Sequence, residues 1–594
     1  MAGFPRATGQ PSPAWGQPRT ALAAAWRREW LVVLLLAGLA SFLLFWRLAE
    51  PPKYIYDEVY HSFTANLMTR NDPRVYQWWN SAQPNPIPGV EYEWTHPPLA
   101  KLIIAGGIKL WGNNSWGWRF FSALWGVFSV VLIYTLARQL FRDRSIALLA
   151  GLFLLTDGLM FSEARIGTND IFQLAFLLAA YNAFVLYLHR QARHGLGLLA
   201  LTGLLLGLAF ASKWPAVFSI GLLAAIALVR GFWPHRDPAL AATLQAGLTE
   251  PAANGALDSG LATDEPEQAH QASDSANDPG ALGAGPDGAP DHGSAFAAVA
   301  NSQGAARASV PDEATAMGQS HVDDGIGGTP AGRAPEVGAS GEVTWRGFAP
   351  WEVPARLWYL VAAVCSLVLL PIGLYILSYL QMYLQPHHIP ADYAQIGPFH
   401  IGALTLGPAT LTSSSWWNMF VGEQWQMWHY HTTLKDHHPY YSLWWQWLLD
   451  IRPVFYYVNR AGDTVANTYA LGNPILYWVF PLGIVAGAIL VWRRRRQAWL
   501  ALVLGAFAVN WLPWIHSPRG LFFYHFLPSV PFLVMLMAHG VVALHRRPEV
   551  LWRRIAIAYT AAVFLGFAFF YTQLSAWPVP GWWADLHYWL PSWQ

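Results

Sequence analysis

Long apolar segments recur along this chain from Leu31 to Gln573, and they constrain its fold more than any other feature. A helix that crosses the hydrocarbon core of a bilayer needs about 20 predominantly apolar residues. Charged residues make up only 12% of the chain, whereas a soluble domain carries about 25%. The sequence therefore predicts an all-α polytopic membrane protein.

About eleven segments are candidate transmembrane helices. They cover residues 30–48, 117–140, 145–161, 171–189, 196–212, 214–230, 356–378, 474–492, 498–514, 521–543 and 555–574. Basic residues concentrate before the first segment, at Arg27 and Arg28, and between alternate pairs, as in the run from Arg493 to Arg496. The positive-inside rule then predicts a cytoplasmic N-terminus and a C-terminus outside.

Two long outer loops follow from this order, at residues 49–116 and 379–473. The first belongs to an N-terminal transmembrane module, 26–236, and the second to a C-terminal module, 346–594. The Trp-rich stretches of the second loop are expected to be amphipathic segments that lie on the membrane surface.

Two other segments have the composition of disordered chain. Residues 1–25 are polar and contain Pro and Gly, and residues 237–345 are acidic and nearly free of large aliphatic side chains. Such an insert cannot bury enough apolar surface to offset its ordering entropy, so we expect it to be disordered and cytoplasmic. A folded regulatory domain is the alternative. The net charge of +1 gives no argument for nucleic acid as a partner, and the single Cys365 excludes an intramolecular disulfide.

The segment YDEVYH at 56–61 places two carboxylates, Asp57 and Glu58, at the outer end of the first candidate span. An ionisable group at a membrane boundary is a functional-site hypothesis, because burying it is costly. Its surroundings can tune an aspartate into a general base. The alternative is a pair of solvated loop acids beside a helix end.

The same outer loop carries His61, Glu93 and the turn THPPLAK, with His96 and Lys101. Two consecutive prolines stiffen this turn, and so fix an imidazole and an ammonium near the membrane boundary. The alternative is a loop-to-helix turn with a lysine that reaches to the interface.

More cationic and hydrogen-bonding residues lie at the predicted outer ends of other spans. They are Arg119, Arg165, Asp170, Lys213, Arg519, Tyr524 and His525. Each cation alone could be an interfacial anchor, but as a group they run against the positive-inside trend. An anionic head group such as a lipid phosphate would account for them. A carboxylate base beside a phosphate clamp predicts sugar transfer from a polyprenyl phosphate.

Seven segments follow one another in the order of a known family. They are YDEVYH, THPPLAK, RFFSALWG, SEARIGTNDIF, GLAFASKWPAVF, HPYYSLWWQWLLDIRPVFYY and SPRGLFFYHFLP. Through them the chain resembles the bacterial protein O-mannosyltransferases, glycosyltransferase family 39 of the GT-C superfamily. It departs from the family pattern at Leu448, where a proline is expected, and at Thr168 and Asn169.

The resemblance implies a GT-C fold and the transfer of mannose, or another hexose, from a polyprenyl-phosphate donor in the membrane. The acceptor would be a Ser or Thr hydroxyl of an exported protein, at the outer face of a bacterial plasma membrane. Asp57 would be the base of one inverting displacement, and Glu58 would orient the acceptor or keep Asp57 ionised. The donor phosphate would bind Arg119, Lys213, Arg519, His525, Tyr524 and Lys101. His96, His61, Arg165 and Asp170 are further site candidates.

Three other functions remain open at this point. A GT-C enzyme could glycosylate a lipid or a cell-wall glycan instead of a protein. A transporter would place its ionisable residues at mid-bilayer in repeated halves, and a non-catalytic scaffold would leave the shared face of acids and cations unexplained. The reaction requires no metal, although the Asp57–Glu58 pair could bind a divalent cation. If neither Asp57 nor Glu58 is the base, Glu91, Glu93 or Asp170 is next.

Overall fold

The structure is a computed structural model that describes residues 18–82, 89–190, 195–232, 353–401, 404–411, 415–435, 438–493 and 498–594. The predicted insert 237–345 lies outside the described residues, and so do residues 1–17 of the predicted N-terminal segment. Residues 18–25 are helical, because α1 begins at Pro18. The expectation of disorder over the whole of 1–25 was therefore wrong at its C-terminal end.

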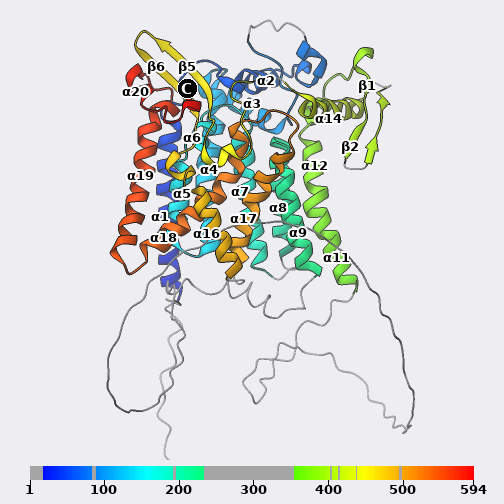
Figure 1. The fold of residues 1–594 in the computed structure, drawn as a ribbon. Helices are drawn as coiled ribbons and strands as arrows, with labels where there is room; N and C mark the ends of the chain where they lie inside the picture. The colour runs from blue at the N-terminus through cyan, green and yellow to red at the C-terminus, as the bar shows by residue number, and fades with distance from the viewer. Residues whose placement is uncertain are drawn as a thin grey trace, which may run out of the picture. The chain divides into compact units, whose positions relative to one another are not determined.

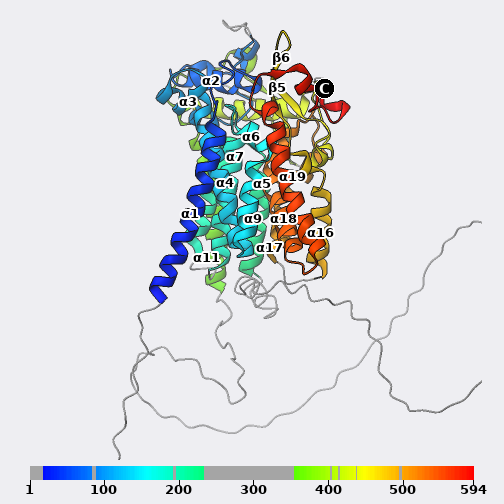
Figure 2. The same cartoon turned by 90° about the vertical axis from the view of Figure 1, so that its left-hand side faces the viewer.

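Helices of different lengths lie side by side and form the body of the protein (Figures 1 and 2). They are α1 (Pro18–Phe45), α4 (Ser115–Phe141), α5 (Arg144–Leu155), α6 (Gly158–Glu163), α7 (Asp170–Leu188), α8 (Leu196–Ser212), α9 (Ala216–Phe232), α11 (Val353–Val364), α12 (Leu370–Leu377), α16 (Phe480–Arg493), α17 (Ala498–Trp511), α18 (Val530–His545) and α19 (Val550–Leu574). Many of their apolar faces are exposed, as in Leu482 and Trp492 of α16. Apolar surface of this extent indicates contact with lipid.

Among the described residues, seven helical segments are long and apolar enough to cross a membrane. They match seven of the eleven predicted spans. The other four correspond to shorter apolar helices, Glu29–Phe45, Arg144–Leu155, Leu196–Ser212 and Ala216–Gly231. The chain is therefore a multi-pass membrane protein, and the count of about eleven crossings stays a prediction. So does the orientation of its ends.

A second layer covers one end of the helices, with α2 (His61–Met68), α3 (Leu99–Trp111), α14 (Trp416–Thr433) and the strands (Figure 1). Smaller elements complete the chain: α13 (Leu380–Tyr383), α15 (Pro474–Tyr477), α20 (Gly581–Asp585) and the short helical turns η1 (Tyr56–Val59) and η9 (Phe523–Ser529). The layer is built mainly from the two predicted outer loops. All the proposed site residues come from it or from the helix ends beneath it.

The second predicted outer loop contains strands, which an all-α prediction missed. β5 (Val454–Ala461) and β6 (Thr464–Ala470) form an antiparallel hairpin, and β7 (Val579–Pro580) from the C-terminal tail pairs with β6. β1 (Gln395–Ile396) pairs with β4 (Ala409–Thr410), and β2 (Phe399–Ile401) with β3 (Leu404–Leu406). The described chain is still mostly helical. The hairpin matters because it brings Tyr456 next to the site.

Local sequence explains where the helices begin. Asn114 starts α4 by accepting a hydrogen bond from the Gly117 amide at 2.9 Å, as asparagine commonly does at a helix N-terminus. Asp157 does the same for the Met160 amide at 2.8 Å, and so separates α6 from α5 within one predicted span. Glycines let α3 and α4 touch, because a Cβ on Gly107 would lie 2.4 Å from the Gly117 carbonyl oxygen.

Candidate functional site

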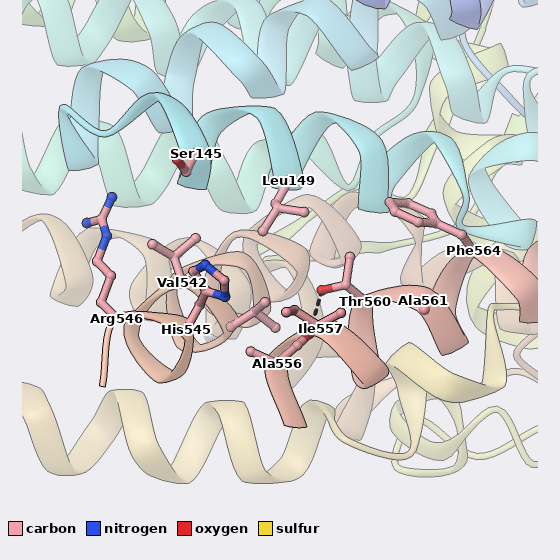
Figure 3. Close-up of a pocket in the computed structure, with 11 residues that line it drawn as sticks. Ser145, Leu149, Val542, His545, Arg546, Ala556, Ile557, Thr560, Ala561 and Phe564 are labelled. Atoms are coloured by element: carbon pink, nitrogen blue, oxygen red, sulfur yellow. Dashed lines mark hydrogen bonds between the residues drawn. The ribbon is translucent and has the colours of Figure 1, made fainter. Parts of the chain in front are cut away.

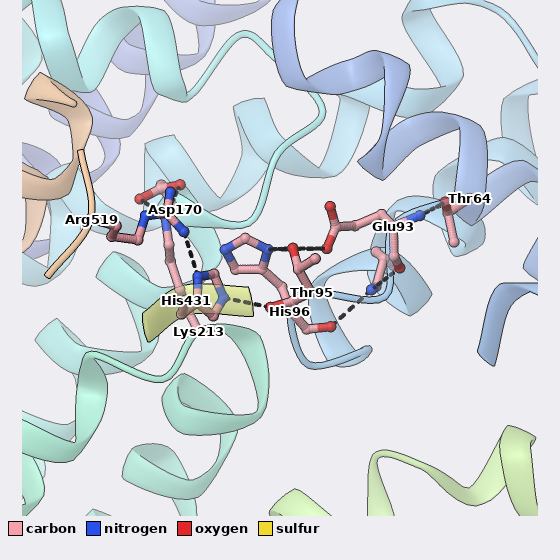
Figure 4. Close-up of polar contacts among 9 residues, drawn as sticks. Thr64, Glu93, Thr95, His96, Asp170, Lys213, His431 and Arg519 are labelled. Carbon is pink, nitrogen blue, oxygen red and sulfur yellow. Dashed lines mark hydrogen bonds and ion pairs between the residues drawn. The ribbon is translucent and has the colours of Figure 1, made fainter. Parts of the chain in front are cut away.

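Polar side chains from six distant segments meet at the end of the helices that the second layer covers. They include Asp57 from η1, Glu93 and His96 from the turn before α3, Asp170 at the start of α7, Lys213 between α8 and α9, His431 near the end of α14, and Arg519 before η9. Figure 4 shows most of this group, with hydrogen bonds running from Arg519 through His431 toward Thr95. The structure thus brings together residues that the sequence analysis selected separately.

Asp57 lies among these groups and keeps part of its surface accessible. Burial raises the pKa of its carboxyl to about 7, and the nearby carboxylates of Glu93 and Asp170 push in the same direction, against the cations Lys213 and Arg519. The preceding residue, Tyr56, holds a left-handed backbone with φ of 45°, which is strained for a bulky side chain. Such strain persists only where the surroundings enforce it.

Glu58 has a different environment, although it is the next residue. Its side chain is fully buried and forms an ion pair with Arg119, which is also fully buried, at 2.7 Å. The carboxylate also accepts hydrogen bonds from the Ile55 and Gly167 amides, at 3.0 and 2.8 Å. Both oxygens are therefore occupied by the fold. The prediction that Glu58 orients an acceptor has no support in this geometry.

Arg119 and Arg165 hold the chain that follows α1. Besides pairing with Glu58, Arg119 donates to the carbonyl oxygens of Leu48, Pro51 and Lys53. Arg165 donates to the carbonyl oxygens of Leu43, Leu44, Trp46 and Arg47, at 2.7 to 3.4 Å. The last carbonyls of a helix need such partners. This geometry does not support Arg119 as a phosphate ligand, because its guanidinium already donates to Glu58 and to backbone carbonyl oxygens.

Lys101 is also committed to the backbone. Its ammonium is buried and donates to the carbonyl oxygens of Glu93 at 2.6 Å and His96 at 2.9 Å. Burial lowers the pKa of Lys101, while the charge of Glu93 raises it. The lysine therefore holds the turn in place, and its assignment as a phosphate ligand is not supported.

Lys213, Asp170 and Tyr524 form one contact group. The Lys213 ammonium lies 2.7 and 2.8 Å from the two Asp170 carboxylate oxygens, and 5.1 Å from the centre of the Tyr524 ring. The Tyr524 ring lies 6.0 Å from that of Tyr56 in an edge-to-face arrangement. These residues connect the Asp57 turn with α7 and η9.

Arg519 is the least committed of the proposed phosphate ligands. Its Nε donates to the Gly520 carbonyl oxygen at 3.3 Å and its Nη1 contacts His431 Nδ1, so Nη2 has no hydrogen bond among the described residues. The guanidinium is half-buried. His525 instead bonds within its own turn, from Nδ1 to the Phe522 carbonyl oxygen at 2.9 Å, and stacks between Trp447 and Tyr524.

His61, Glu93 and His96 make a compact cluster beside Asp57. Burial lowers the pKa of His96 to about 3 and that of His61 well below its usual value, although Glu93 opposes both shifts. For Glu93, burial raises the pKa, but the two histidines and Lys101 outweigh it and hold the carboxyl ionised.

Two buried residues of this region, Glu163 and Glu423, and the half-buried His431 were not selected from the sequence. Glu163 bonds with Tyr456 of β5 and accepts from the Thr168 hydroxyl at 3.1 Å, and burial raises its pKa to about 8. Glu423 and His431 lie on α14. An acid and a histidine within an aromatic-rich segment were the available signal for α14, but the segment was interpreted as membrane surface.

A separate cavity of about 480 Å³ lies between α5, α18 and α19 (Figure 3). Apolar side chains such as Leu149, Val541 and Phe564 line it, together with His545 and Arg546. Its residues lie toward the His545 end of the helical span Phe523–His545, whereas the polar cluster lies at the Phe523 end. None of the proposed site residues line this cavity.

Comparison with known proteins supports the family. The model described as dolichyl-phosphate-mannose-protein mannosyltransferase matches residues 95–247, and the C-terminal four TMM region of protein-O-mannosyltransferase matches residues 416–593. The polyprenol-phosphate-mannose–protein mannosyltransferase of Mycobacterium tuberculosis is 24% identical, over 96% of this chain and 92% of its own. The chain belongs to the protein O-mannosyltransferase family. It is a membrane-embedded glycosyltransferase.

Two further relatives of this family agree with the assignment. The mannosyltransferase of the same name from Mycolicibacterium smegmatis is 23% identical over 95% of this chain and 93% of its own. A structure of the S. cerevisiae protein O-mannosyltransferase Pmt1–Pmt2 complex bound to the sugar donor superposes with a TM-score of 0.61, covering 96% of this chain and 93% of that chain at 14% identity. This likeness confirms the GT-C type of fold that was predicted.

Proposed function

We propose that this chain transfers mannose from a polyprenyl-phosphate mannose to a Ser or Thr hydroxyl of an exported protein. The names of its bacterial relatives support this donor and this class of acceptor. The proposed reaction is a single displacement that inverts the anomeric configuration, with Asp57 as general base. It takes place at the outer face of a bacterial plasma membrane.

The observation that carries the proposal is the environment of Asp57. A general base works best when its pKa lies near the operating pH, and burial raises the pKa of Asp57 to about 7. The carboxyl remains partly accessible, so an acceptor hydroxyl can reach it. Glu58, its neighbour, is fully buried and paired with Arg119, so an acceptor hydroxyl cannot reach it.

The proposed roles of the other residues follow from which donors remain available. Asp57 takes the proton of the acceptor hydroxyl, whose oxygen attacks the anomeric carbon from the face opposite the phosphate. The bond between the sugar and the phosphate breaks, and the polyprenyl phosphate leaves with the electron pair. Arg519 stabilises the charge that develops on the phosphate, since its Nη2 has no hydrogen bond in the part of the chain that the structure describes. Lys213 contributes a second positive charge from its pair with Asp170.

Purified protein with polyprenyl-phosphate [¹⁴C]mannose and a Ser/Thr-rich peptide tests the proposal. We expect labelled peptide that survives organic extraction and is released by β-elimination. Asp57→Asn should lower transfer by at least about 100-fold while donor binding is retained. A parallel reaction with membrane lipid or cell-wall glycan in place of peptide separates the acceptors. Label in lipid or glycan alone would contradict protein as the acceptor.

The outward placement of the site needs its own experiment. The single cysteine, Cys365, is replaced by serine, and one new cysteine is introduced at exposed Arg460 in β5. A membrane-impermeant maleimide should label this cysteine in intact cells. A cysteine at exposed Glu549 between α18 and α19 is the matched control and should react only after lysis. The reverse pattern would overturn the orientation.

A further inference from the structure

The cluster of His61, Glu93 and His96 takes no part in the transfer reaction as derived above. One ligand atom from each residue lies within 4.8 Å of the other two. His96 Nδ1 and Glu93 Oε1 are 3.1 Å apart, and the ring centres of His61 and His96 are 5.4 Å apart. Two imidazoles and one carboxylate are a common ligand set for zinc and other transition metals.

One atom of the cluster lacks a partner. His61 is 3% exposed, and its Nδ1 is buried without a hydrogen bond among the described residues. An unsatisfied buried polar atom is costly, so it calls for an explanation such as a bound ion. The pairing of His96 with Glu93 leaves this ring nitrogen unexplained.

The residues around the cluster hold it in place. The Glu93 amide donates to the Thr64 hydroxyl at 2.8 Å, and the Thr95 hydroxyl donates to Glu93 Oε1 at 2.7 Å. Lys101 fixes the carbonyl oxygens on both sides of the turn. Metal ligands in proteins are typically oriented by outer hydrogen bonds of this kind.

We propose that His61, Glu93 and His96 bind a divalent transition-metal ion, with zinc as the metal that fits the donor set best. Imidazole nitrogens suit zinc, whereas magnesium and calcium prefer a shell of oxygens. Two ligand atoms on one tetrahedral zinc lie about 3.3 Å apart when the metal–ligand bonds are about 2.0–2.1 Å. Small side-chain rotations bring a cluster of this size to that spacing. Three protein ligands leave a fourth position open.

Nearby charges partly balance the ion. Lys101, Lys213 and Arg519 oppose a dication, while the carboxylates of Asp57 and Asp170 offset them in part. The carboxylate of Glu93 supplies direct charge compensation.

The ion would join α2 to the turn before α3. The carbonyl oxygen of Thr95 in this turn lies 2.8 Å from His431 Nε2, and His431 Nδ1 contacts Arg519. Metal binding therefore holds the turn that positions His431. Because His431 contacts Arg519, the position of Arg519 is then held as well. The ion acts on the position of Arg519 and need not touch donor or acceptor.

Direct metal binding tests the proposal without a transfer assay. Full-length protein that carries no polyhistidine tag is stripped with a chelator in detergent and titrated with Co²⁺. We expect visible ligand-field absorption that saturates at one Co²⁺ per chain and is displaced by Zn²⁺. Glu93→Gln and His61→Gln should each weaken binding by at least about 100-fold, because loss of an outer partner alone costs 10–100-fold.

His516→Ala is the matched control, since this histidine is exposed and lies outside the cluster; it should bind Co²⁺ like the unsubstituted protein. No ligand-field band with the unsubstituted protein would overturn the site, and this result does not depend on any variant folding. One tightly bound Co²⁺ that survives both cluster substitutions would overturn the assignment of ligands. A protein that binds the metal but transfers no mannose would contradict the proposed function and leave the metal site standing.

Discussion

Asp57→Asn and Glu58→Gln are the same chemical change at adjacent positions, and the structure predicts opposite outcomes. Each replaces one carboxylate oxygen by an amide nitrogen of similar size. Asp57→Asn should leave the protein folded and abolish transfer. Glu58→Gln should destabilise the fold, and each folded molecule should keep most of its activity.

The cost of Glu58→Gln follows from its ion pair. Glu58 and Arg119 are both 0% exposed, and Arg119 would keep its buried charge with no counter-ion. Removing one partner of a buried pair costs about 3–5 kcal/mol. The substitution also places amide hydrogens where the carboxylate accepts from Arg119 and Gly167. We therefore expect a clear fall in the melting temperature in detergent.

For Asp57 the sign is reversed. Its folded-state pKa lies above the ordinary value. Ionisation of this carboxyl therefore lowers the free energy of unfolding of the protein as the pH rises from 3.8 toward 7. At about 1.36 kcal/mol per pH unit, the change from 3.8 to about 7 corresponds to about 4 kcal/mol. Solvent screening reduces this to on the order of 2 kcal/mol, because the side chain is partly accessible. Asp57→Asn should thus melt at or above the temperature of the unsubstituted protein at neutral pH.

The assay is a thermal melt in detergent together with single-turnover transfer, normalised to the folded fraction. The reasoning is refuted if Glu58→Gln melts like the unsubstituted protein and has lost transfer, since Glu58 would then act in the chemistry. It is also refuted if Asp57→Asn transfers mannose at a normal rate. The base would then be sought at Glu91, Glu93 or Asp170.

Three further predictions follow from the same contacts. The kcat/KM of transfer should fall as the pH drops below about 7, because burial raises the pKa of the Asp57 carboxyl to about that value; a rate that stays flat down to pH 4 would contradict this. Arg519→Lys should raise the transfer barrier by about 2–4 kcal/mol, because lysine lacks the planar fork, and exposed Arg460→Lys should show normal kinetics. Gly167→Ala should destabilise the fold by about 1–3 kcal/mol, because its Cβ would lie 2.2 Å from the Ser62 hydroxyl. Gly38→Ala, which meets nothing within 4 Å, should melt normally.

Hydropathy predicted the helices well, because a span is a local property of about 20 residues. The β5–β6 hairpin was missed, although FYYVNRAGDTVANTY has hairpin signals. Aromatic and β-branched residues flank a short turn there, and Gly462 in the turn has φ of 59°. The Trp-rich stretches beside it led instead to the prediction of amphipathic segments on the membrane surface.

The roles of Asp57 and Glu58 could not be separated from the sequence, because they depend on distant contacts. Glu58 is bonded to Arg119 and to the Gly167 amide, 61 and 109 residues away. Nothing local distinguishes the two acids. The turn η1 points Glu58 toward Arg119 and the Gly167 amide, and it leaves Asp57 partly accessible.

The excess of cations at this end of the helices has two causes, and only one concerns a ligand. Arg119 and Arg165 together collect seven backbone carbonyl oxygens between Leu43 and Lys53. This is the stretch that leaves α1 and leads directly into the Asp57 turn. A helix end offers carbonyls that must find donors, and a guanidinium supplies five in one rigid group. Arginines at such a place therefore fix the base by fixing its backbone. A cation remains available for phosphate only where its donors are not already used, which among the arginines of this group is the case for Arg519.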